Sequence, residues 1–175
     1  PFRSEAITYP GFLSTPRGGL QFIHRTGCSG NGDWHLSEYE PGKGWCELGV
    51  LFSGAGTFEH CPTRCAYPDP LRYGPDGRLH VTWCWREHPS DRPLDLMTNH
   101  DLGYAYSDDF GRTWKNNDGV PVAKLGGADA YPIQVDSPGI HGAKIPLFWG
   151  LMNTTGMHVD AAGLVHVLNW QNPPD

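Results

Sequence analysis

Glycine and proline are spread so densely along the chain that almost every window of a dozen residues contains a helix breaker. The 175 residues include 23 Gly and 16 Pro. Short segments between the breakers alternate apolar and polar side chains, which is the period of a strand with one buried face. The clearest are "GLQFIHR", "WHLSEYE", "RLHVTWCW", "LGYAYS" and "LVHVLNW". The sequence therefore predicts an all-β protein.

The size and charge of the chain limit its organisation and its partners. We expect residues 1–175 to form a single domain, because 175 residues are enough for one sizeable core. The net charge is −6 and no run of Lys or Arg occurs, which argues against nucleic acid and against an anionic membrane as the main partner. No apolar run approaches the ~18 residues of a membrane span.

Five cysteines and three aspartates leave a structural metal ion open. The odd number of cysteines means that at least one is free or pairs outside the chain. The stretch "CPTRC", Cys61 to Cys65, fits either a disulfide loop or half of a Zn²⁺ site. Asp33, Asp69 and Asp136 lie in turns that fit Ca²⁺ or plain turn geometry. No cofactor is required by any of these patterns.

Three segments of the chain are versions of one another. "DGRLHVTW", residues 76–83, returns as "AGLVHVLNW", residues 162–170, and more weakly as "GGLQF", residues 18–22. Spacings wider than the ~40 to 50 residues of one propeller blade suit blades that carry loop insertions. The repeats favour a β-propeller.

The stretch "SDDFGRTW", Ser107 to Trp114, predicts a hairpin corner that satisfies its own polar groups. Its Asp residues can accept hydrogen bonds from nearby backbone amides, Gly111 supplies a positive φ, Thr113 adds a side-chain bond, and Trp114 fills the gap between sheets. The pattern resembles the Asp-box, or BNR repeat, of sialidase-like β-propellers. In that family the Asp-box is structural, so the resemblance gives Asp109 and Trp114 no catalytic role.

More of the chain resembles one branch of that group, the propeller polysaccharide lyases of the ulvan lyase and rhamnosyl-glucuronate lyase type. The segments that carry the resemblance are "EAITYPGFL", "GCSGNGDW", "GPDGRLHVTWCWRE", "TNHDLGYAYSDDFGRTW" and "GLMNTTGMHVD". It implies a propeller of about seven four-stranded blades, of which this chain covers three to four as a fragment of a longer protein. It also implies an exported, secreted or periplasmic, enzyme that cleaves an acidic, uronate-containing glycan by β-elimination.

The segment "TNHDLGYAYS" is the first candidate for an active-site strand. Strict alternation places His100 and Tyr104 on one face and Asn99 and Asp101 on the other. The imidazole of His100 suits acid or base catalysis at neutral pH, while Asn99 and Tyr104 can bind substrate. The alternative is that Asn99 and Asp101 are bulge or turn residues and His100 is structural.

The segment "RLHVTWCWRE" is the second candidate. Alternation places His80, Thr82, Cys84 and Arg86 on one face, opposite an aromatic face. The repeat puts His166 in the place equivalent to His80, which favours a structural role for both histidines. The glycine-rich loop "GCSGNGDWH" could also surround a ligand, but no helix follows it, so it is not a phosphate loop.

Together these residues give a complete hypothesis for elimination. Arg86 and Asn99 neutralise the uronate carboxylate, His100 transfers the proton and His80 assists. Related lyases also use a Tyr and an Arg further downstream. Here Arg112 is the last Arg and Tyr131 the only later Tyr. Tyr131 or His158 could take the place of the missing groups.

Two other functions fit the same resemblance. A sialidase-like hydrolase would need an Arg cluster on the substrate carboxylate and a Tyr nucleophile with an adjacent base. A non-catalytic glycan-binding propeller would use the same funnel and aromatic side chains without turnover.

Overall fold

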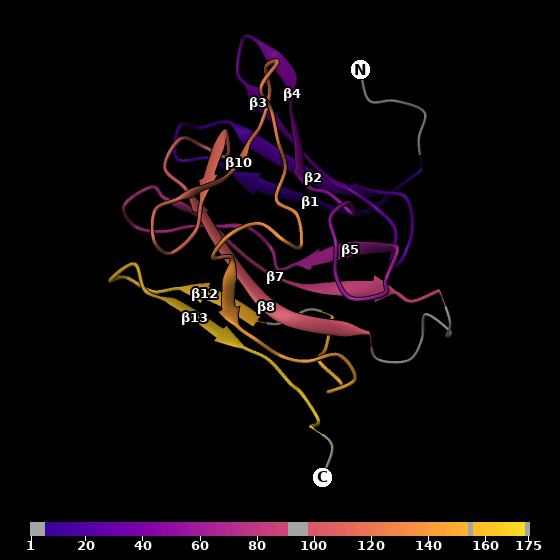
Figure 1. Cartoon of the computed structure of the whole chain (residues 1–175). Coiled ribbons are helices and arrows are strands. Elements are labelled where there is room, and N and C mark those ends of the chain that lie inside the picture. The colour runs from indigo at the N-terminus through magenta and orange to yellow at the C-terminus, as the bar shows by residue number, and fades with distance from the viewer. Residues whose placement is uncertain (1–5, 91–97, 154–155, 174–175) are drawn as a thin grey trace.

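The computed structural model describes residues 6–90, 98–153 and 156–173, and these residues form strands, turns and loops without an α-helix. The strands gather into three sheets that follow one another in chain order, from the top of Figure 1 to the yellow hairpin at its lower left. The all-β prediction is confirmed. In the part of the chain that is described, no helix is long and apolar enough to cross a membrane.

The first sheet is a four-stranded antiparallel meander, as a propeller blade requires. Its strands, in spatial order, are β1 (Ile7–Ser14), β2 (Leu20–Thr26), β3 (Trp34–Glu40) and β4 (Gly44–Phe52). At the end of the edge strand β4, Phe52 forms a single parallel β-bridge with Ile133. A loop of the second half of the chain therefore covers the end of this edge.

The second sheet has seven strands and is larger than the expected blade. Strands β10, β9, β8, β7 and β5 lie in that order, while β6 also pairs with β7 and β11 with β8. Their bounds are β5 (Thr63–Pro68), β6 (Arg72–Tyr73), β7 (Leu79–His88), β8 (Asn99–Ser107), β9 (Thr113–Lys115), β10 (Pro121–Lys124) and β11 (His141–Ala143). The third sheet contains β12 (Gly156–Val159) and β13 (Val165–Leu168).

The three sequence repeats fold into the same hairpin turn. In the turns that begin at Thr15, Gly74 and Asp160, the first residue's amide donates to the carbonyl four residues on, at 2.9, 2.8 and 3.0 Å. In each turn the fourth residue is a glycine with φ between 80° and 83°. These turns join β1 to β2, β6 to β7 and β12 to β13. The sequence repeat therefore marks one hairpin in each sheet.

The main core lies between the first and second sheets. Tryptophan dominates it: Trp83 and Trp114 are 0% exposed and Trp85 is 1% exposed. They pack with Trp34, Leu36 and Phe52 of the first sheet in one cluster. A second cluster, which includes Tyr67, Cys84 and Leu102, covers the other face of the second sheet. β7 is therefore buried on both faces along most of its length.

The Asp-box is built as its sequence predicts, at the turn between β8 and β9. The carboxylate of Asp109 accepts from the amides of Arg112 and Thr113 at 3.1 and 2.8 Å. The hydroxyl of Ser107 accepts from the amide of Gly111 at 2.8 Å, and Gly111 has a φ of 85°. Thr113 takes part through its backbone amide rather than through the side chain that the sequence suggested.

Candidate active site

A β-bulge in β8 decides which side chains share a face. Arg86 pairs with Asn99 and Trp85 with His100, but the next pair toward the other end of the strand skips Asp101. Asp101 has a φ of 51°, in the left-handed region that few residues other than glycine adopt. The extra residue reverses the alternation beyond it.

The expected faces of β8 are therefore wrong for its first two residues. Asn99 lies on the same face as Tyr104 and Arg86, whereas His100 lies on the opposite face with Trp85. Strict period-two reading fails here because a bulge places two residues opposite one. Asp101 is the bulge residue that the alternative interpretation named.

Arg86 is the centre of a group of hydrogen-bonded side chains that we call the Arg86 cluster. Its members are Arg86, Asn99, Tyr67, Ser29 and Asn153. The Nε atom of Arg86 donates to Asn99 Oδ1 at 2.8 Å, and Nη1 donates to Ser29 Oγ at 3.2 Å and to the Tyr67 hydroxyl at 3.4 Å. Nη2 donates to Asn153 Oδ1. Arg86, Ser29 and Asn153 are half-buried, so the cluster keeps contact with solvent.

Among the described residues, no carboxylate balances the positive charge of the Arg86 cluster. Each acceptor that these residues offer to Arg86 is a neutral amide or hydroxyl oxygen. Within the described ranges, the ion pairs of the protein use other cations, such as Arg64, Arg78 and Arg112. A guanidinium held by neutral acceptors retains its attraction for an anion. The cluster can therefore bind a carboxylate.

A second arginine, Arg25 of β2 in the first sheet, also contacts Tyr67 of the Arg86 cluster. Arg25 is only 4% exposed, and its guanidinium lies 5.5 Å from the centre of the Tyr67 ring, while that of Arg86 lies 4.8 Å from it. Burial opposes the charge of Arg25, but its hydrogen bond with Tyr67 and its interactions with Cys65 outweigh burial, so the pKa of Arg25 is raised. The Tyr67 ring thus contacts two guanidinium groups.

Tyr67 and its neighbours are the part of the site that sequence reasoning missed. Alternation within β5 puts Cys65 and Tyr67 on one face, but only the pairing of Cys65 with Arg86 shows which face this is. Ser29 comes from the glycine-rich loop considered as a ligand loop, and its Oγ lies 2.9 Å from the Tyr67 hydroxyl. Asn153 is brought in from 67 residues along the chain. Its segment, "GLMNTTGMHVD", carried the family resemblance, but nothing in the sequence singled out Asn153.

His100 is completely enclosed on the other face of the sheet. It is 0% exposed, and the ring of Phe58 stacks on it with centroids 3.8 Å apart. Its Nε2 lies 3.1 Å from Glu87 Oε1 and its Nδ1 lies 3.1 Å from Asp101 Oδ2. Burial opposes protonation, but the bonds to Asp101 and Glu87 prevail and raise the pKa of His100. The imidazole is held as a cation between two carboxylates.

The Glu87 carboxylate also connects His100 to a buried arginine. Arg64 is 0% exposed, and its Nε donates to both oxygens of Glu87 at 2.9 and 3.1 Å. The other nitrogens of Arg64 donate to four backbone carbonyls of the loop between β4 and β5, at residues 54, 55, 56 and 61. This network fixes a loop at the same end of the sheet as the Arg86 cluster.

The raised pKa of His100 predicts a pH-dependent stability. A group whose pKa is higher in the folded state stabilises it fully below the unfolded value, about 6.5, and loses that contribution as the pH rises through the folded pKa. We therefore expect the free energy of unfolding to decline above neutral pH, and to decline less in His100→Gln. Urea unfolding of both proteins from pH 6 to 9 measures the difference. Parallel curves would show that His100 does not titrate with folding.

His80 and Tyr104 form a separate pair. His80 Nδ1 lies 2.9 Å from the Tyr104 hydroxyl. Burial lowers the pKa of His80 and raises that of Tyr104 to about 12. His80 lies six residues before Arg86 on β7, about 20 Å away at ~3.3 Å per residue. The structure therefore brings Arg86 and Asn99 together, and His80 and Tyr104 together, but places the two pairs at opposite ends of the sheet.

The other sequence candidates lie outside the Arg86 cluster. His166 is exposed and its Nε2 lies 2.8 Å from Asp160 Oδ2. His158 pairs with His166 across the third sheet. Tyr131 is 43% exposed and exchanges backbone hydrogen bonds with Lys124.

The cysteines and turn aspartates do not gather around a common point. All five cysteines are free thiols. Among the described residues, no group of three or more His, Cys, Asp or Glu side chains is placed to hold a metal ion. Asp33 and Asp136 instead accept hydrogen bonds from the amides of Gly54 and Thr57, at 2.7 and 3.3 Å.

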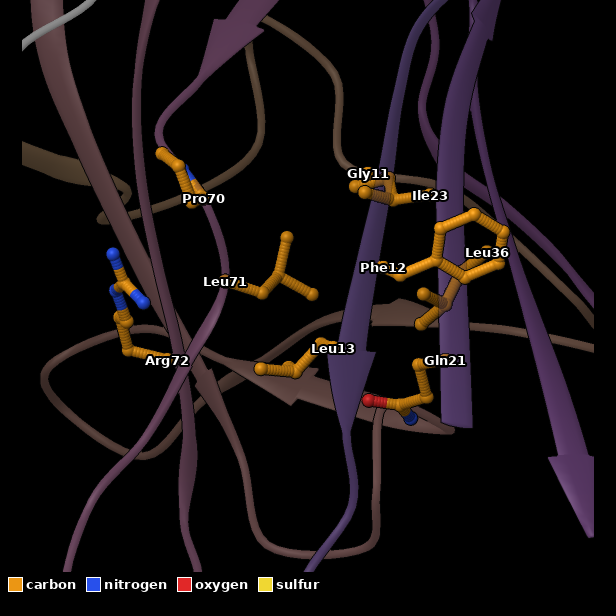
Figure 2. Close-up of a pocket in the computed structure, with 9 residues that line it drawn as sticks. All are labelled: Gly11, Phe12, Leu13, Gln21, Ile23, Leu36, Pro70, Leu71 and Arg72. Carbon is orange, nitrogen blue, oxygen red and sulfur yellow. The ribbon is translucent and has the colours of Figure 1, made fainter. Parts of the chain in front are cut away.

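A small apolar pocket lies between the first sheet and the segment that joins β5 to β6. Figure 2 shows Leu13 and Leu71 facing one another across it, with Arg72 at one side. Its volume is about 80 Å³, well below the roughly 300 to 1,000 Å³ of typical ligand sites. Its lining shares no residue with the Arg86 cluster.

Comparisons with known proteins place this arrangement in context. A family described as "BNR repeat-containing family member" matches residues 2–175. No curated protein matches the sequence. The fold is similar to that of the polysaccharide lyase Uly1, with a TM-score of 0.69 and 21% identity over 92% of this chain and 34% of that protein.

Two structures of a PL25 ulvan lyase are similar to the same degree. The one bound to -[GlcA(1-4)Rha3S]- gives a TM-score of 0.70 and 14% identity, and the second gives 0.70 and 15%. Each comparison covers 93% of this chain and 36% of the lyase. The chain thus spans about a third of the length of these proteins. The similarity confirms that its sheets are part of a β-propeller.

Proposed function

The chain belongs to the BNR repeat-containing family, and from that membership and the Arg86 cluster we propose that it is part of a polysaccharide lyase acting on a uronate-containing glycan. The observation that carries the proposal is the half-buried guanidinium of Arg86, whose acceptors among the described residues are all neutral. A similar fold occurs in an ulvan lyase whose structure holds a chain of glucuronate and sulfated rhamnose.

The Arg86 cluster suits the charge change of β-elimination. When the C5 proton leaves, negative charge spreads onto the uronate carboxylate, and preorganised donors stabilise that charge more strongly than water does. Arg86 provides such donors at the end of β7. Asn99 orients Arg86 rather than donating to the substrate, because its amide nitrogen already donates to the Leu151 carbonyl and to Asn153 Oδ1, each at 2.8 Å.

The proton transfers require a group beside the carboxylate site. In the elimination a base removes the C5 proton, the C–H electrons form the C4–C5 double bond, the C4–O bond breaks, and the leaving oxygen takes up a proton. Tyr67 is the member of the Arg86 cluster with an ionisable hydroxyl, and we assign it to proton transfer. His100 supports the site from the opposite face by fixing the bulge at Asp101.

The product of the reaction tests this proposal. Elimination leaves an unsaturated uronate that absorbs in the ultraviolet, whereas hydrolysis leaves none. We expect absorbance to rise when the protein is incubated with ulvan or a rhamnosyl-glucuronate glycan. New reducing ends without absorbance would make the protein a hydrolase, and binding without either product would make it a glycan-binding propeller. A polymeric substrate of this kind also favours a secreted or periplasmic location.

A further inference from the structure

Tyr9 is an exposed aromatic residue in an unusual backbone conformation. Its side chain is 52% exposed, and its φ is 53°. Bulky residues rarely adopt this left-handed region, and strained residues of this kind concentrate at ligand sites. Tyr9 lies at the register shift between Thr8 and Gly11 on β1. The Tyr9 ring contacts Tyr67 of β5, in the neighbouring sheet, and Trp34 of β3.

The exposed ring of Tyr9 is held in place from below. The Arg25 guanidinium lies 4.9 Å from its centre, a cation–π contact. The Tyr67 ring meets it edge-on at 5.8 Å and 79°, and the Trp34 ring lies at 6.0 Å. These three contacts leave 52% of Tyr9 exposed to solvent. An aromatic side chain fixed in this way loses little conformational freedom when it binds a ligand.

Tyr9 is directly connected to the Arg86 cluster. Arg25 contacts both Tyr9 and Tyr67, and Tyr67 contacts both Tyr9 and Arg86. The four groups form one connected set of aromatic rings and guanidinium groups, of which Tyr9 is the most exposed member. A sugar next to a uronate held at Arg86 would therefore lie within reach of Tyr9.

We propose that Tyr9 is the stacking platform of a sugar subsite adjacent to the Arg86 cluster, a role that rests on the proposed function of that cluster. Its ligand is the pyranose ring that neighbours the uronate in the glycan chain. Pyranose rings present C–H groups on their faces, and these pack on the exposed, electron-rich face of an aromatic ring. The charge of Arg86 would hold the uronate and the Tyr9 ring would select its neighbour.

Oligosaccharide binding tests the subsite directly. Isothermal titration of the protein with uronate-containing tetrasaccharides should give about tenfold weaker affinity for Tyr9→Ala, while Tyr9→Phe, which keeps the ring, should bind like the unchanged protein. Free glucuronate, which lacks a neighbouring sugar, should bind both variants equally. Phe12→Ala is the matched control, because Phe12 is 68% exposed on the same strand but packs against Phe22 and Trp45 instead.

A second variant separates binding from folding. Asn tolerates the left-handed region better than Tyr, so Tyr9→Asn should unfold at an equal or higher temperature while it binds the tetrasaccharide as weakly as Tyr9→Ala. Equal affinity of Tyr9→Ala and the unchanged protein would overturn the subsite, as would a loss shared by Phe12→Ala. Since affinity is measured, absence of elimination product would refute the lyase activity and leave this test intact.

Discussion

Arg86→Ala is expected to lower kcat/KM on a uronate-containing glycan by roughly 10² to 10³, the loss that follows removal of one preorganised donor for transition-state charge. The reason is geometric. Arg86 donates at the same time to Asn99, Ser29, Tyr67 and Asn153, so its guanidinium is fixed before substrate arrives. Initial rates of absorbance increase over a range of glycan concentrations give the measurement.

Two further variants show whether charge or geometry is responsible for the effect of Arg86. Arg86→Lys keeps the charge but loses the planar fork of donors, and should recover only a small part of the activity. Arg78→Ala removes an arginine whose partner is the exposed Asp108, at 2.8 Å, and should leave kcat/KM unchanged. Full activity in Arg86→Lys would mean that a point charge is enough. Full activity in Arg86→Ala would remove this cluster from the reaction.

Trp114→Ala is expected to have the largest effect on stability, a loss of about 3 to 5 kcal/mol in the free energy of unfolding. The Trp114 side chain is 0% exposed and belongs to the main core between the first two sheets. Its Nε1 also donates to the Gly111 carbonyl at 2.9 Å, so the substitution removes both core volume and a bond that closes the Asp-box. Urea unfolding at neutral pH measures the change.

Trp170→Ala provides the comparison for the Asp-box variant. The Trp170 side chain is 58% exposed, so its removal should change stability by no more than about 0.5 kcal/mol. A loss below 1 kcal/mol for Trp114→Ala would show that the Asp-box does not close the core. The stability effects of the Trp114 and Arg86 variants should also be independent of each other. Asn99 and Ser107 lie at opposite ends of β8, about 26 Å apart at ~3.3 Å per residue, so the losses of Trp114→Ala and Arg86→Ala should add in the double variant.

The features that sequence reasoning predicted correctly depend on neighbouring residues. The density of Gly and Pro excludes long helices, and the Asp-box bonds join residues no more than four apart. The three repeated turns likewise close within five residues and need only one glycine with positive φ. Where the bonded residues are this close in the sequence, the local amino-acid sequence is enough to specify the turn.

The faces of β8 were predicted wrongly because their cause lies far along the chain. Asp101 keeps its left-handed conformation by exchanging bonds with Ile145, from Asp101 N to the Ile145 carbonyl at 2.9 Å and from Ile145 N to Asp101 Oδ1 at 2.8 Å. These partners are 44 residues apart. Strict alternation along one strand takes no account of such a distant contact. It therefore assigned His100 to the face that Asn99 occupies, and Asn99 to the face that His100 occupies.

By itself, the sequence determined that the chain is all-β and where its Asp-box and several of its turns lie, and it named Arg86 and Asn99 as candidates for binding a carboxylate. Only the tertiary structure decided that they meet, that Tyr67, Arg25, Ser29 and Asn153 join them, and that His100 is enclosed with Glu87. The physical reason is the range of the interactions: turns satisfy their own backbone, whereas a buried charge is placed by whichever distant strands and loops supply its partners.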